Sequence, residues 1–114
     1  MAFKLVKGGS YKWPVKFSVA QDGGGYEVMT FDAEFKRIGR DEFHSLMEDA
    51  EADESSVKLL REVMIGWTGI LDGEGNEVPF SETNREALFN FRPGLPLQIS
   101  RCYFESIAAD KVKN

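Results

Sequence analysis

The hydrophobic residues of this chain change their spacing once, near residue 36, and that change limits the folds available to it. Before it, Val15, Phe17 and Val19 alternate with polar residues, which is the spacing of a strand with one face on a core. Glycines at 23–25 favour a chain reversal, and a second alternating segment covers 29–36. The sequence therefore predicts an antiparallel β-hairpin, which must pack on other elements because a hairpin alone is only marginally stable in water.

Helical spacing of hydrophobic residues follows in four segments. Gly66 is expected to end the second helix as a C-cap residue, because glycine tolerates the left-handed backbone at that position. In the third helix, Ala87, Leu88 and Phe91 are expected to face the core. These patterns predict an α+β fold, in which an N-terminal antiparallel β-hairpin packs on a small bundle of about four helices. The expected helices cover 39–50, Ser55 or Ser56 to 65, Ser81 or Thr83 to 92, and 96 to about 109.

A chain of 114 residues is long enough for one hydrophobic core and too short for two. Residues 1–14 have no clear period and are expected to form a mobile N-terminal arm, with residues 15–114 as a single α+β domain. Residues 67–80, between the second and third helices, are rich in glycine and predict a tight loop or miniature hairpin. Its inward-facing residues are expected to be Ile70, Val78 and Phe80.

Charge and composition argue against several classes of protein. The net charge is −5, with seven acids and no base in residues 41–56. Such a chain is poorly suited to nucleic acid, because affinity for phosphate comes from Lys and Arg. A single cysteine, Cys102, excludes an intramolecular disulfide and suits a reducing cytoplasm, and a single histidine, His44, excludes a multi-histidine metal site. No apolar run approaches the roughly 18 residues that a membrane-spanning helix needs.

No catalytic, cofactor or metal site is expected. Residues 72–76 imitate the start of an EF-hand calcium loop, but Glu77 stands where glycine is needed and Thr83 where glutamate is needed. The acidic run 48–54 has no ring nitrogen or thiolate and predicts a solvated helix end. Cys102 lies on an apolar stripe without a nearby histidine, so a packing role is expected for it. The sequence therefore predicts a protein that is not an enzyme.

Two apolar stripes lie on nearly opposite sides of the last expected helix. The core of one small domain can cover one of them. The other is therefore expected to bind a protein partner and to leave Leu97 and Phe104 at least partly exposed. The alternative is that these two side chains pack beneath the N-terminal hairpin. The covered stripe is expected to be Leu95, Ile99, Cys102 and Tyr103, and the protein-binding stripe Leu97, Arg101, Phe104 and Ala108.

Two short motifs carry a resemblance to a known family. They are Gly66-Trp67-Thr68-Gly69-Ile70 and, after Asp72-x-x-Gly75, Val78-Pro79-Phe80-Ser81. The chain from about Val15 to Ala109 resembles the tail assembly chaperones of long, non-contractile-tailed bacteriophages or prophages. The motif residues are expected to be structural, as a helix end, a core aromatic and the lead into a capped helix. They are Gly66, Trp67, Gly69, Pro79, Phe80 and Ser81.

The resemblance implies a non-enzymatic role in the host bacterial cytoplasm. Such chaperones are similar in coating the long tape measure protein before tail-tube subunits polymerise around it. The implied partners are therefore the tape measure protein and, as a second candidate, the tail-tube protein, whereas no cofactor, nucleic acid or membrane is implied. Self-association is left open. The alternative is a small structural virion protein, of the tail or a connector, whose hairpin edge pairs with neighbouring copies by strand addition.

Overall fold

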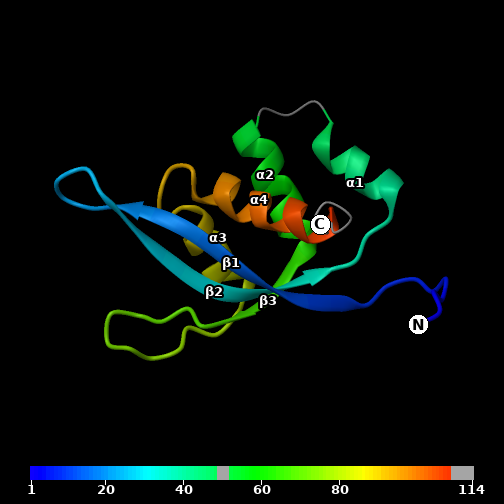
Figure 1. Ribbon diagram of the computed structural model, residues 1–114, viewed down its shortest axis with the longest axis horizontal. Coiled ribbons are helices and arrows are strands. Elements are labelled where there is room, and N and C mark those ends of the chain that lie inside the picture. The colour runs from blue at the N-terminus through cyan, green and yellow to red at the C-terminus, as the bar shows by residue number, and fades with distance from the viewer. Residues whose placement is uncertain (49–51, 109–114) are drawn as a thin grey trace.

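In the computed structural model, which describes residues 1–48 and 52–108, a three-stranded antiparallel sheet packs against helices (Figure 1). The strands lie in the order β1-β2-β3, so β1 and β3 form the two edges. The predicted α+β class, with an N-terminal hairpin and four helices, is confirmed for the described residues. The elements are β1 (Ser10–Ala20), β2 (Tyr26–Lys36), α1 (Arg40–Met47), α2 (Ala52–Val63), β3 (Met64–Thr68), α3 (Glu82–Phe89) and α4 (Leu95–Ile107).

The β1–β2 hairpin is longer than predicted. Its pairing runs without a shift from Ser10 opposite Lys36 to Ala20 opposite Tyr26. Residues 10–14, expected to belong to the arm, are therefore part of β1. The strand extends because Tyr11 and Trp13 continue the alternation toward the N-terminus, and both are half-buried. Residues 50 and 109, where the first and last helices were expected to end, lie outside the described part of the chain.

The prediction for Gly66 is wrong, because α2 ends at Val63 and the chain passes directly into β3. The pairing partners across β2–β3 include Ala33 with Trp67 and Glu34 with Gly66. A Cβ atom added to Gly66 would lie 3.1 Å from a carboxylate oxygen of Glu34. Gly66 therefore permits the close approach of a neighbouring strand's side chain, which is another common reason for glycine in a strand.

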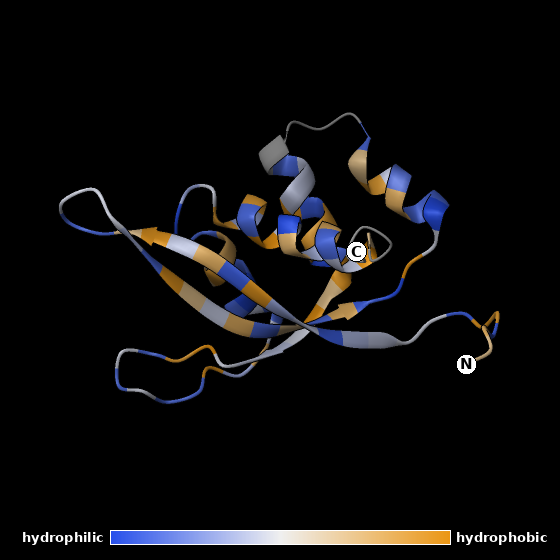
Figure 2. Cartoon of the chain, in the orientation of Figure 1, coloured by the Kyte–Doolittle hydropathy of each residue, from blue (hydrophilic) through white to orange (hydrophobic). Residues whose placement is uncertain are grey.

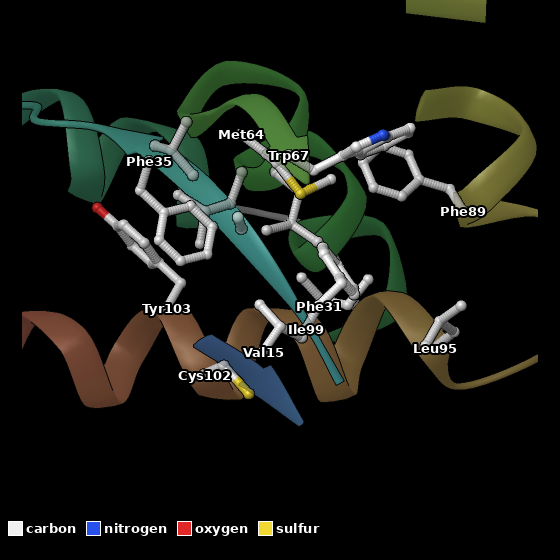
Figure 3. Close-up of a cluster of buried hydrophobic side chains, with 14 residues drawn as sticks. Val15, Phe31, Phe35, Met64, Trp67, Phe89, Leu95, Ile99, Cys102 and Tyr103 are labelled. Carbon is white, nitrogen blue, oxygen red and sulfur yellow. The ribbon is translucent and has the colours of Figure 1, made fainter. Parts of the chain in front are cut away.

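The core lies between the inner face of the sheet and the helices α2 and α4. Figure 3 shows side chains of α4 directed at those of the strands, among them Ile99 beside Val15 and Tyr103 beside Phe35. The Phe35 and Tyr103 rings meet edge to face, with centroids 5.1 Å apart. The stripe expected to be covered is buried: Leu95, Ile99, Cys102 and Tyr103. Among the described helices, none combines the length and apolar character needed to cross a bilayer.

Gly69 stands where the chain leaves β3, and its φ of +94° lies in the left-handed region. Residues with a Cβ atom adopt this region only with strain. Because the loop that follows depends on this turn, Gly69 has a conformational role that the sequence motif did not specify.

Replacing Gly69 by alanine should lower the free energy of unfolding by about 1–2 kcal/mol, through backbone strain. Gly73→Ala is the matched control, because a Cβ atom there would meet no described atom within 4 Å and φ lies outside the left-handed region. Urea denaturation of both variants measures the difference. Equal stabilities of the two variants would contradict the role assigned to Gly69.

Candidate functional site

The predicted protein-binding stripe lies on the outer side of α4. Arg101 is exposed, whereas Leu97 and Phe104 are half-buried, so the partial exposure expected for both side chains is observed. Ala108, also half-buried, caps the C-terminus of the helix. The structure therefore brings the four predicted residues together on one side of α4, and their binding role stays a prediction.

The Phe104 side chain has a structural neighbour that the sequence did not identify. Its ring lies edge to face with that of Phe43 on α1, with centroids 6.0 Å apart. The alternative prediction placed Phe104 beneath the hairpin, but the ring packs against α1 on another side of α4. Part of the stripe thus holds α1 in place, which leaves Leu97 and Arg101 as its more accessible part.

The outer edge of β1 is occupied by side chains of α4. The Ser18 amide donates a hydrogen bond to Gln98 Oε1 (3.0 Å), and the Cys102 thiol donates one to the Lys16 carbonyl (3.5 Å). Pro14, Lys16 and Ser18 are alternate residues of β1, so their backbone polar groups face the same edge. Pro14 has no N–H to donate there. Burial raises the pKa of Cys102, which favours the protonated thiol seen as a donor here. Much of this edge is therefore closed to another strand.

A larger apolar surface, which the sequence did not predict, lies where the hairpin, the 69–80 loop and α3 meet. We call it the α3 groove. It has a volume of about 550 Å³, and its rim includes the polar residues Asn84 and Arg92. Phe91 and Leu71 are 65% and 57% exposed at this surface. Its apolar lining comprises Phe17, Val19, Met29, Phe31, Trp67, Ile70, Leu71, Val78, Ala87, Leu88, Phe91 and Leu95.

The α3 groove lies beside α4, because α4 packs along β1 and not along the other two strands. Hydrogen bonds place α4 beside β1 between Tyr11, which bonds Ser106, and Ser18, which bonds Gln98. The groove lies over Met29 and Phe31 of β2 and Trp67 of β3, and the 69–80 loop and α3 flank it.

Trp67 attaches the loop to the sheet. Its indole N–H donates a hydrogen bond to the Val78 carbonyl at 2.8 Å. Its ring also meets Phe31 and Phe80 edge to face, with centroids 6.4 and 5.0 Å apart. Half-burial of Ile70, Val78 and Phe80 agrees with the prediction that the loop turns these residues inward. Trp67 is also part of the core, as the motif predicted.

The 72–76 turn satisfies its own polar groups. Asp72 Oδ1 accepts hydrogen bonds from the amides of Glu74 and Asn76, and the Asp72 amide donates to the Asn76 carbonyl. Glu77 accepts a hydrogen bond from the Gly69 amide at 2.7 Å. Among the described residues, no three histidine, cysteine or acidic side chains gather in a way that could hold a metal ion. The turn is thus a glycine-rich connection between the two loop segments that line the groove, 69–71 and Val78.

Polar contacts hold α3 in place as the wall of the groove opposite the 69–80 loop. Ser81 is its N-cap and accepts a hydrogen bond from the Asn84 amide at 3.0 Å, which decides between the two predicted starts of this helix. Arg61 of α2 donates two hydrogen bonds to Glu86, at 2.9 and 2.7 Å. These bonds lower the pKa of Glu86. The contribution of the pair to stability is therefore present at neutral pH and is lost as the pH falls through that lowered pKa.

The prediction that Ala87 and Phe91 face the core is wrong. Ala87 and Phe91 are exposed, Leu88 is half-buried, and the buried side chain of this helix is Phe89. Helical spacing does not apply to Phe91, because α3 ends at Phe89 and Phe91 lies in the bend that follows. A clue in the sequence was Pro93, since the residues before a proline tend to leave the helix.

Comparisons with protein-family models, with curated proteins and with solved structures found no match to this chain. The candidate site comprises an exposed apolar groove, whose lining also includes Asn84 and Arg92, and the outer stripe of α4.

Trp67→Phe should lower the free energy of unfolding by about 1–2 kcal/mol, because the part-buried Val78 carbonyl loses its indole donor. The loop should also loosen, so that the Val78 amide, which bonds the Ile70 carbonyl, exchanges its hydrogen faster. Hydrogen-exchange NMR and urea denaturation measure the two effects. Trp13→Phe on β1 is the control and should leave exchange at Val78 unchanged; equal exchange rates at Val78 in both variants would contradict the role of Trp67.

Proposed function

We propose that this protein is a phage tail assembly chaperone, which binds the tape measure protein and assists tail-tube assembly without catalysing a reaction. The observation that carries the proposal is the α3 groove, an apolar surface held open on a rigid scaffold. Exposed apolar patches of this kind typically mark protein-binding sites. The resemblance of the motifs around Trp67 and Phe80 to tail assembly chaperones supplies the partner. The role belongs to the host bacterial cytoplasm, where tails are assembled.

The chemistry of the groove fits an amphipathic helix. Such helices bind apolar grooves through large side chains spaced three and four residues apart, while their polar side stays in water. Phe91 and Leu71, on opposite walls, provide exposed apolar contacts. Asn84 and Arg92 on the rim can hydrogen-bond the polar side of the same helix. A tape measure protein is a long helical chain with abundant apolar surface, so it offers many segments of this kind.

The outer stripe of α4 provides a second contact in this proposal. Leu97 and Arg101 are its accessible members and would contact either a further segment of the tape measure protein or the tail-tube protein. Phe104, which belongs to the same stripe, packs on Phe43 of α1 and so helps to hold the stripe in place.

The alternative of a small structural virion protein, built by strand addition, receives less support. Strand addition requires free outward N–H and C=O groups on an edge strand. On β1, the Ser18 amide and the Lys16 carbonyl bond side chains of α4, and Pro14 has no N–H. A sheet edge protected in this way favours binding through side chains.

The double variant Leu71→Ser/Phe91→Ser should bind a tape measure segment of the same phage at least about tenfold more weakly. A fully buried large apolar side chain contributes ~1.5–3 kcal/mol, and about 1.4 kcal/mol corresponds to a tenfold change in the dissociation constant. Both side chains are exposed, so the fold should be unaffected. Isothermal titration calorimetry measures the binding, and circular dichroism checks the fold.

Val28→Ser is the matched control, because Val28 is also an exposed apolar residue but lies on the outer face of β2. It should bind like the wild type. Leu97→Ser/Arg101→Glu tests the α4 stripe separately and should weaken binding only if that stripe is the second contact. Undiminished binding by the groove variant would refute the groove as the site. Stoichiometric copies of the protein in purified virions would instead favour the structural role.

A further inference from the structure

Arg92 is the only charged residue, among those the structure describes, that lines the α3 groove. It also lines an adjoining cavity of about 270 Å³ next to Tyr26, and no other described residue there carries a charge. The groove and this cavity share Phe17, Val19 and Leu95 as well. Figure 2 shows hydrophobic colour along the hairpin and on parts of the loop between β3 and α3, in agreement with this apolar lining. A partner in the groove therefore meets one positive charge among otherwise uncharged side chains.

The Arg92 backbone is held in a tight turn between α3 and α4. The Leu95 amide donates a hydrogen bond to the Arg92 carbonyl (3.3 Å), and Gly94 has a φ of +83°. Pro93 and Gly94 occupy the two central positions, where a type II turn favours proline and then glycine. The guanidinium carbon lies over the Phe91 ring, 5.0 Å from its centroid. Backbone and side chain are thus both placed before a partner binds, which lowers the entropy cost of binding.

No described carboxylate forms an ion pair with Arg92. Glu86 lines a further cavity together with Arg92, but its two oxygens already accept hydrogen bonds from Arg61. The loop residue Glu77 does not line the groove, and it accepts a hydrogen bond from the Gly69 amide. Within the described part of the chain, the N–H donors of Arg92 are therefore available to a carboxylate of a partner.

The chemistry of a guanidinium selects such a carboxylate. Its planar fork of N–H donors matches the two oxygens of Asp or Glu, whereas a lysine or arginine placed beside it is repelled. When the apolar stripe of an amphipathic helix enters a groove, the residues that border the stripe lie at the edge of that groove. An acid at this border can pair with Arg92, and a base there meets a like charge.

We propose that Arg92 determines which helices the α3 groove accepts, by favouring an amphipathic helix whose apolar stripe is bordered by Asp or Glu. The inference rests on the proposed function, because it concerns the partner of the same groove, and it adds the charge of that partner. Apolar contacts supply most of the affinity in this arrangement, while Arg92 supplies the discrimination between one helix and another.

Two synthetic amphipathic peptides test this preference by isothermal titration calorimetry. They share one leucine stripe and differ at the positions that border it, which are glutamate in one peptide and lysine in the other. The wild type should bind the glutamate peptide about tenfold more tightly, because the lysine peptide places like charge beside Arg92. Arg92→Glu should reverse this preference. Arg92→Lys should keep its direction but reduce it, since lysine lacks the planar fork.

Arg37→Glu is the matched control, because it changes the net charge by the same amount as Arg92→Glu. Arg37 is also exposed and also lies over an aromatic ring, that of Tyr11 at 4.6 Å, but it does not line the groove. This variant should keep the preference for the glutamate peptide. Both arginine side chains are exposed, so circular dichroism should show an unchanged fold for both variants.

Equal affinities of the wild type for the two peptides, or a preference that survives Arg92→Glu, would overturn the inference and leave the groove as a binding site. A preference lost equally in Arg37→Glu would assign it to net charge and would also overturn the inference. Failure of the proposed function gives a different result: neither peptide binds, or Leu71→Ser/Phe91→Ser binds both as tightly as the wild type. Either of these results would overturn the groove as the site, and the role of Arg92 with it.

Discussion

The Trp67 side chain is the contact on which the candidate site depends. It is the last buried residue of β3, and it joins three segments that are distant in sequence: the hairpin through Phe31, the loop through the Val78 carbonyl, and the start of α3 through Phe80. Aromatic rings that meet edge to face add to the free energy gained by burial, and the indole N–H satisfies a part-buried carbonyl. Without this residue, the loop would keep only the packing of Ile70, Val78 and Phe80 on the core to hold it beside the sheet.

The shape of the molecule's apolar surface follows from this contact of Trp67. Helix α4 packs along β1, so part of the inner face over β2 and β3 is left for the loop and α3 to flank. Arg61 and Glu86 tie α3 to α2, and this connection keeps Leu88 and Phe91 at the groove's edge. An open apolar groove is a liability for a free protein, because it favours association. A protein whose function is to shield another apolar chain requires such a surface.

Local patterns in the sequence predicted the elements better than the site. Alternation in β1 and β2 and helical spacing after them were sufficient for the α+β class, because each signal depends on a single segment. Gly66 was misassigned, since a glycine after a helical pattern indicates a C-cap as readily as a crowded strand. The groove was not predictable in this way. It is formed by Met29, Leu71 and Phe91, which come together only through tertiary packing.

On the function proposed above, this protein acts by presenting an apolar groove to a helical partner. The most direct measurement is a titration of a tape measure segment into the isotopically labelled protein, followed by NMR chemical shifts. We expect the largest shifts at Leu71, Leu88 and Phe91, with small shifts on the outer face of the sheet around Lys12 and Asp32. Shifts confined to that outer face, or no shifts at saturating concentrations of the segment, would contradict the claim.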